Sequence, residues 1–325
     1  MILAATDDRI RFVTQPDHAA LAGRFAEAWG GEAVDAPTPK PAVRLAVHAH
    51  DDGWWPRDRR PRLKPDGTPY DFYEIPAAQW MRLQRRGVDA VARADPYAGL
   101  LVSLHAAGLR RQRYGLSPSW PETPRAFRGF VEREQRRQRS LATALREDDT
   151  DDRLSVDDSA LITHLHDAGE PPSEVFPGTA RDPHLWRNYR LLSALDALSL
   201  RICATPTRMG SSVGSWDGEE RCDDEGSNRE GRSDGAQTDP GAVEVAPIEI
   251  PHVPTRPGEP DTTLSATPCF GDSWRIDPYP FDRSPVTVHV PTRTVDSTSF
   301  QDERTLFDRY YAAEIEEITV TMRPA

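Results

Sequence analysis

The spacing of apolar residues changes once along this chain, and that change limits the folds open to it. Up to about residue 205, apolar residues recur at helical spacing in segments separated by Pro and Gly. Beyond residue 242, the segments "AVEVAPIEI", "PVTVHVP" and "EEITVTM" alternate apolar and polar residues, as half-buried strands do. We therefore expect a mainly α protein, in which a helical domain over residues 1–205 carries a small C-terminal β element.

The segment between the two patterns, residues 206–242, differs from both. It has few apolar residues and is dense in Gly, Ser, Asp and Glu. Such a composition buries too little surface to offset the entropy lost on ordering the chain. We expect a disordered or loosely held acidic insertion, followed by a β-rich extension over residues 243–325 that packs on the helical domain.

Caps and breakers divide the first 205 residues into seven expected helices. The first starts near Gln15 with Pro16 in its first turn and stops at Gly30-Gly31. The other six expected helices cover residues 41–52, 77–94, 95–111, 124–147, 155–169 and 182–204. A long loop over residues 54–76 separates the second helix from the third.

Charge and cysteine content exclude several classes of protein. Asp and Glu outnumber Lys and Arg by 52 to 40, whereas nucleic-acid binders carry a concentrated positive face. The excess of acid, with Lys40 and Lys64 as the only lysines, suggests a halophilic or high-GC source. Three cysteines without CxxC spacing argue against a zinc knuckle or a disulfide framework. Without a signal segment or a run of about 18 apolar residues, we expect a soluble cytoplasmic protein that binds a small-molecule substrate, no nucleic acid and no membrane, in an oligomeric state left open.

Residues 48–55 read "HAHDDGWW" and contain the first candidate metal ligands, His50 and Asp51. A His-Asp dipeptide is weak by itself, because a chain of this composition contains about one by chance. This chain contains a second, His166-Asp167, but no companion series of helices accompanies it. We leave that second dipeptide outside the site.

His50 is distinguished by its place on the expected helix. Val43, Ala46, Val47 and His50 fall at i, i+3, i+4 and i+7, so His50 continues an apolar stripe toward the interior and Asp51 lies one step around from it. The alternative is a histidine at a helix end followed by a capping aspartate.

Other helices also place a polar residue on an apolar stripe. His105 continues the stripe of Leu101, and Asp196 continues that of Leu192, while His18 lies in the first turn of its helix. A buried carboxylate without a partner is costly, so Asp196 needs a metal, an arginine or a cluster of donors. We expect these polar groups to converge on one site. The alternatives are a capped helix start at His18, a satisfied core histidine at His105 and a buried salt bridge at Asp196.

The ordered series His18, His50-Asp51, Asp196 has the form H…HD…D and resembles the HD-domain superfamily of metal-dependent phosphohydrolases. More closely, "TQPDHAALAGRFAEAWG", "HAHDDGWWPRDRRP", "DGTPYDF", "DPYAGLLVSLHAAGL" and "NYRLLSALDALSL" are similar to successive segments of the domain of unknown function family 3891. The resemblance covers most of residues 10–205 and implies an HD-domain-like helical bundle.

The resemblance also implies a set of site residues. His18, His50, Asp51 and Asp196 would bind one or two divalent ions, for which Mn, Fe, Ni and Zn all suit imidazole with carboxylate. Asp51 and His105 would be catalytic, with His105 binding a second ion or contacting the substrate.

The sequence is compatible with three functions. The first is hydrolysis of a small phosphorylated metabolite or nucleotide, for which Arg57 and Arg60 are candidates to hold phosphate oxygens. The second is di-iron oxygenase chemistry on the same scaffold. The third is a non-catalytic sensor or structural metal site. Asp52 could orient a ligating histidine as a hydrogen-bond acceptor, or could face solvent.

Overall fold

A computed structural model describes residues 1–6, 8–116, 123–148, 151–167, 183–205, 246–269 and 273–325. The insertion expected over residues 206–242, which contains Cys222, lies outside the described residues, so its predicted disorder stays a prediction.

The long helices lie where the periodicity predicts them, within a few residues at each end. Local signals account for several starts: Thr14 accepts a hydrogen bond from the backbone N–H of Asp17 at 3.1 Å, and Asp95 accepts one from Ala98 at 2.9 Å. The helices are α1 (Gln15–Ala28), α2 (Lys40–Ala49), α3 (Trp55–Asp58), α4 (Ala77–Ala94), α5 (Pro96–Gly108), α6 (Arg128–Glu147), α7 (Val156–Asp167), α8 (His184–Ala204) and α9 (Glu303–Ala312).

The β structure is far more extensive than the sequence indicates. Its strands are β1 (Ile2–Ala5), β2 (Ile10–Val13), β3 (Ile248–Val253), β4 (Thr262–Pro268), β5 (Ser273–Asp277), β6 (Val286–Val295) and β7 (Ile315–Pro324). They form one seven-stranded sheet in the order β1-β2-β6-β7-β5-β4-β3, antiparallel except where β5 runs parallel to β7. The expectation of a mainly α, HD-like bundle with a small C-terminal β element is therefore wrong.

The N-terminal strands join the sheet by pairing with the C-terminal part of the chain. In β2, Ile10 lies opposite Val295 and Arg11 opposite Thr294 of β6. The Arg11 guanidinium is buried and donates to the carbonyl oxygens of Cys203, at 3.1 Å, and Thr205 at the end of α8. The sheet thus draws strands from both sides of the predicted boundary at residue 205 and is tied to the last helix before it.

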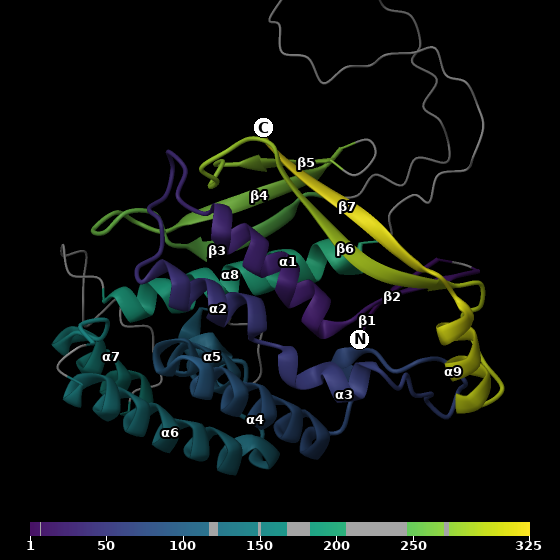
Figure 1. The fold of residues 1–325 in the computed structure, drawn as a ribbon, viewed down its shortest axis with the longest axis horizontal. Coiled ribbons are helices and arrows are strands. Elements are labelled where there is room, and N and C mark those ends of the chain that lie inside the picture. Colours follow the sequence, from purple (N-terminus) through teal and green to yellow (C-terminus); the bar gives the residue numbers. More distant parts are fainter. Residues whose placement is uncertain (7, 117–122, 149–150, 168–182, 206–245, 270–272) are drawn as a thin grey trace, which may run out of the picture.

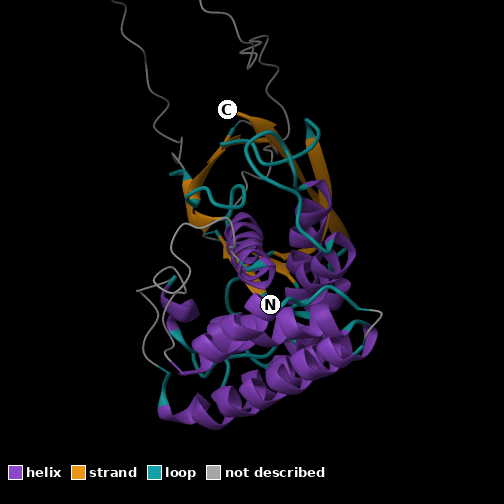
Figure 2. Ribbon diagram, turned by 90° about the vertical axis from the view of Figure 1, so that its left-hand side faces the viewer, coloured by secondary structure: helices purple, strands orange, loops and turns teal. Residues whose placement is uncertain are grey.

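The elements form layers. Helices α1, α2 and α8 lie between the sheet and the group of helices α4 to α7 (Figure 1), and α5 of that group contacts both α2 and α8. The same separation, with strands above and helices below, is visible after a quarter turn (Figure 2). Nearly every residue of α5 is buried. Side chains at the contacts of α1, α2, α5 and α8 are therefore screened from solvent.

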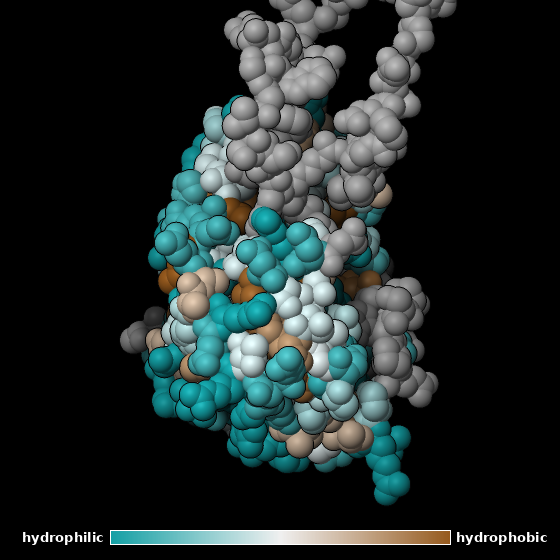
Figure 3. All heavy atoms as spheres, turned by 90° about the vertical axis from the view of Figure 1, so that its right-hand side faces the viewer, coloured by the Kyte–Doolittle hydropathy of each residue, from teal (hydrophilic) through white to brown (hydrophobic). Residues whose placement is uncertain are grey.

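One face of the molecule, the face that carries α9, is mostly polar. On the face that carries α9, hydrophilic residues predominate and hydrophobic ones are scattered among the described residues (Figure 3). None of the described helices combines the length and the apolar character needed to cross a membrane.

Candidate metal centre

Three side chains from three helices meet in the middle layer. His18 lies on α1, His50 ends α2, and Asp196 lies on α8; all three are buried. One ligand atom from each residue lies within 4.8 Å of the other two. Groups separated by up to 178 positions in the chain, from 18 to 196, thus share one small volume.

The ring of His50 is oriented by the helix that it ends. Its Nδ1 lies 2.8 Å from the carbonyl oxygen of Val47, which can only accept, so Nδ1 carries the proton. Its Nε2 then points at carboxylate oxygens, 3.4 Å from Asp196 Oδ1 and 3.9 Å from Asp51 Oδ2. His50 Nε2 is buried and has no hydrogen-bond partner within the described structure.

A serine orients the ring of His18 in the same way as the Val47 carbonyl oxygen orients that of His50, by accepting from Nδ1. Ser199 Oγ donates to the carbonyl oxygen of Asp196 at 3.1 Å, which leaves its lone pairs to accept from His18 Nδ1, also at 3.1 Å. The Nε2 lone pair of His18 therefore faces the cluster, 3.3 Å from Asp51 Oδ2. Two acceptors at that separation need a proton or another cation between them.

Asp51 borders this group and is held by the outer layer. Its Oδ1 accepts from Gln84 Nε2 of α4 at 3.2 Å. The following turn lies against α4 so closely that a Cβ on Gly53 would be 2.1 Å from the carbonyl oxygen of Leu83. Asp51 contacts His18 and His50 but is not one of the three residues whose ligand atoms all lie within 4.8 Å of one another.

The two oxygens of Asp196 face different neighbours. Oδ1 faces His50, whereas Oδ2 lies 3.6 Å from His105 Nε2 and 3.5 Å from Arg113 Nη2. The rings of His50 and His105 meet edge to face, with centroids 5.3 Å apart. His105 is therefore part of the cluster, beside Oδ2 of Asp196 and the ring of His50.

An unusual backbone segment brings Arg113 to this carboxylate. Gln112, Arg113 and Tyr114 have φ values of 53°, 49° and 53°, the left-handed region that residues other than glycine rarely adopt. Tyr114 is fully buried, and its ring lies edge to face with that of Tyr189, 5.4 Å between centroids. Packing of this kind can maintain a disfavoured backbone conformation.

The pKa values of the clustered groups are set by their burial and by the charges of their neighbours. Burial lowers the pKa of His50, but the charges of Asp51 and Asp196 outweigh burial and raise it to about 9. Burial raises the pKa of both carboxyls, and the neighbouring histidines reverse that shift, so each pKa ends below its usual value. Burial lowers the pKa of His105 to about 3, so its ring is neutral. The buried carboxylates thus call for a cation, either a proton on His50 or a metal ion.

Other predicted residues lie apart from the cluster. Arg57 and Arg60 line a separate cavity, and Asp52 is exposed. The second dipeptide lies on α7, where His166 Nε2 is 2.7 Å from Gln138 Oε1 and its Nδ1 is 2.9 Å from Arg139. Those contacts join α6 to α7, and the buried Gln138 also donates to Ser103 of α5 at 3.1 Å.

Sequence reasoning missed three residues of the site. Ser199 lies three positions after Asp196 and so faces the same side of α8, and Gln84 lies on the buried stripe of Leu83 and Gly87. Both positions could have been found by extending the stripe argument. Arg113 had no such signal, because a left-handed backbone places it.

Comparison with known proteins identifies a family. No curated protein and no solved structure matches the chain. The family model described as "Protein of unknown function (DUF3891)" matches residues 1–297. The chain therefore belongs to this DUF3891 family.

Proposed function

We propose that the cluster is a divalent-metal site and that the protein is a metal-dependent phosphohydrolase, acting on a small phosphorylated metabolite or nucleotide. The observation that carries the proposal is the convergence of His18, His50 and Asp196, whose ligand atoms lie within 4.8 Å of one another in a buried volume.

The donor set fits a metal ion. His50 Nε2 is a buried nitrogen without a hydrogen-bond partner in the described structure, and it faces carboxylate oxygens. Ser199 and the Val47 carbonyl oxygen hold the Nδ1 atoms, which is how metal-binding histidines are usually oriented. Imidazole with carboxylate suits Mn, Fe, Ni or Zn.

The chain's own residues suggest how a substrate would be held. His18, His50, Asp51 and Asp196 would bind the ion, which would supply Lewis acidity and lower the pKa of a bound water. On the Oδ2 side of Asp196, Arg113 is the candidate for the phosphate oxygens, in place of Arg57 and Arg60. Its side chain is 16% exposed, against 0% for His18, so substrate would approach from the arginine side. His105 flanks the same oxygen, where it can contact the substrate.

The two His-Asp dipeptides supply a matched test. Protein prepared with Mn, Fe, Ni or Zn in turn is measured for metal content and for phosphate release from nucleotides and sugar phosphates. Asp51→Asn should retain the fold and lose phosphate release by at least about a hundredfold, as removal of a metal ligand or of a group that holds one does. Asp167→Asn makes the same chemical change in the dipeptide of α7 and should keep full activity.

Each contrary result identifies a different function. Iron-specific oxygen consumption would favour the oxygenase over the hydrolase. Stoichiometric metal without phosphate release or oxygen consumption would favour a sensor or structural site. Equal activity in Asp51→Asn and Asp167→Asn would remove the cluster from catalysis, and no metal uptake with any of the four ions would leave it a buried network of charges.

A further inference from the structure

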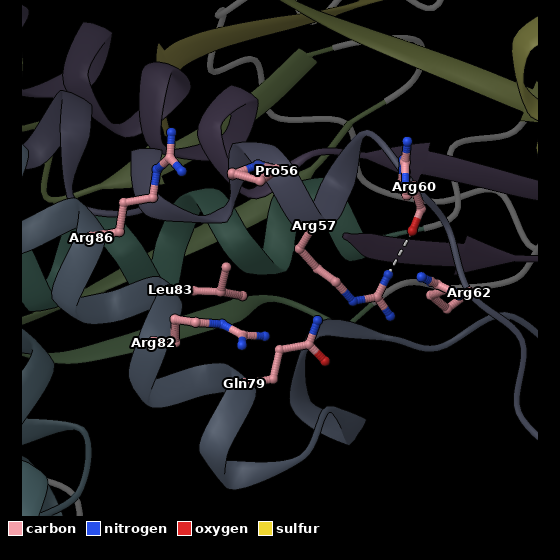
Figure 4. A pocket seen from close by; sticks show the side chains of 8 residues that line it. All are labelled: Pro56, Arg57, Arg60, Arg62, Gln79, Arg82, Leu83 and Arg86. Carbon is pink, nitrogen blue, oxygen red and sulfur yellow. Dashed lines mark hydrogen bonds between the residues drawn. The ribbon is translucent and has the colours of Figure 1, made fainter.

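A second feature of the molecule is a cavity lined largely by arginine. It has a volume of about 220 Å³ and lies between α3 with the loop that follows it and α4. Figure 4 shows the side chains around it, with Leu83 among them. The five arginines are Arg57, Arg60, Arg62, Arg82 and Arg86.

These arginines have little opposing charge. Arg62 pairs with Glu303 of α9, but Arg57, Arg60, Arg82 and Arg86 form no ion pair with any described residue. The nearest acid along the chain, Asp58, is buried and already accepts from the backbone N–H of Gln15 at 2.7 Å. Four arginines thus border one hollow, and none of them is ion-paired with a described carboxylate; the side chains of Arg57 and Arg82 extend toward each other in Figure 4.

The arginines of the cavity are held by local contacts, and their positive charge contrasts with the acidic composition of the whole chain. Arg57 is half-buried, its Nη1 donates to the carbonyl oxygen of Arg60 at 2.9 Å, and its Nε is buried without a partner in the described structure. Arg82 and Arg86 lie one turn apart on α4 and so project on the same side of that helix. The chain carries a formal net charge of −12, so the arginines are not part of a generally basic surface.

The cavity is distinct from the histidine cluster. None of its lining residues belongs to that cluster, although Leu83 in its wall precedes Gln84, which donates to Asp51. Its volume is below the roughly 300–1,000 Å³ of sites for drug-sized ligands. It therefore suits a compact anion, and planar guanidinium groups match phosphate oxygens in geometry as well as charge.

We propose that this arginine-lined cavity binds a small oligophosphate, either inorganic or the oligophosphate tail of a small molecule. It is a site separate from the metal centre, and the inference stands without the proposed hydrolase activity.

The test measures calorimetric binding of inorganic tripolyphosphate, ATP and orthophosphate to the full chain at low and high salt. Tripolyphosphate should bind more tightly than orthophosphate and lose affinity as salt rises. Arg82→Gln/Arg86→Gln should weaken tripolyphosphate binding by at least about tenfold, since each charge-assisted hydrogen bond contributes about that factor or more. Arg60→Gln, which alters the loop after α3, should weaken binding in the same direction.

Two controls separate the cavity from general charge and from the metal site. Arg93→Gln/Arg128→Gln removes the same charge from exposed positions outside the cavity and should leave affinity unchanged. His50→Gln removes a proposed metal ligand and should also retain tripolyphosphate binding. ATP affinity equal to that of tripolyphosphate would indicate recognition of a tail, whereas weaker ATP binding would indicate an inorganic anion.

Several outcomes would overturn the inference. These are no tripolyphosphate binding by the wild-type protein, unchanged affinity in Arg82→Gln/Arg86→Gln, or equal weakening in the control pair. Loss of binding in His50→Gln would assign the anion to the metal centre. Displacement by a short single-stranded RNA that binds more tightly would mark a nucleic-acid surface instead.

Discussion

At the level of single residues, two kinds of hydrogen-bond acceptor orient the imidazole rings of the cluster: a backbone carbonyl oxygen for His50 and a serine hydroxyl for His18. His50 Nδ1 donates to the carbonyl oxygen of Val47, within its own helix. His18 Nδ1 lies 3.1 Å from the side chain of Ser199, on a different helix. Each contact leaves the other ring nitrogen facing the carboxylates. Substitution can remove the hydroxyl, whereas the backbone carbonyl stays in place, so Ser199 is the accessible test of ring orientation.

Ser199→Ala should weaken metal binding by about 10- to 100-fold while leaving the fold intact, because it removes the group that fixes the His18 tautomer without removing a ligand. Metal titration monitored by competition with a chelator measures the change. Ser193→Ala is the matched control, since Ser193 is also buried on α8 and does not contact the histidines through any described hydrogen bond. Equal losses in the two variants would attribute the effect to packing of α8.

Much of the cluster's membership could be inferred from the spacing of single residues. His50, His105 and Asp196 were predicted to face inward because each continues an apolar stripe, and all three are buried together. Their binding of a metal stays a prediction. Arg57 and Arg60 were chosen for proximity in sequence to the motif, and the turn after Asp51 carries them to another cavity. Proximity along the chain is a poor guide where a turn intervenes.

At the scale of elements, the helices were predictable because each is long enough to repeat its pattern. Strands β1 and β2 have four residues each. All four residues of β1 are apolar and all four of β2 are buried, so neither short sequence shows a clear alternation of apolar and polar residues. The partner that makes β2 a strand, β6, lies more than 270 positions later in the chain, as the pairing of Ile10 with Val295 shows. Helix α9 buries only Leu306 and Tyr310, too few positions to define a stripe.

The contact between α4 and the turn after Asp51 provides a prediction at this scale. Gly53→Ala should destabilise the protein by about 1–3 kcal/mol, because its Cβ would overlap the backbone of Leu83 and Gly87. The same shift should loosen the Gln84 hydrogen bond to Asp51 and reduce metal affinity. Chemical denaturation and metal titration measure the two effects.

Gly129→Ala makes the same change where a Cβ meets nothing within 4 Å, near the start of α6. It should leave metal affinity unchanged and stabilise the protein by up to about 1 kcal/mol, through the reduced entropy of the unfolded chain. If Gly53→Ala is as stable as Gly129→Ala, the close approach of the turn to α4 is not rigid.

At the scale of the whole molecule, the sheet joins the two ends of the chain around the middle helices. Strand β1 pairs with β2 and β2 with β6, while α8 lies against both β1 and β3. Most described helices precede residue 205 and most strands follow residue 246. The change of pattern between residues 205 and 243 nevertheless gave no sign that one sheet takes strands from both parts of the chain. Pairing between distant strands depends on tertiary packing, which a local pattern does not contain.

Residues 206–242 separate α8 from the strands that follow it in the chain. Replacing them with a short Gly/Ser linker should leave the thermal midpoint and the metal content unchanged, because the segment offers few apolar side chains to a core. The flanking elements already touch, since Arg201 near the end of α8 donates to the carbonyl oxygen of Glu249 in β3 at 3.1 Å. A linker therefore has a short gap to bridge. Thermal unfolding and elemental analysis of the shortened protein test this directly, with an Arg201→Gln variant of the full chain to measure how much the α8–β3 contact contributes. Insoluble protein or a lowered midpoint after the replacement would mean that the acidic segment packs on the fold and contributes to its stability.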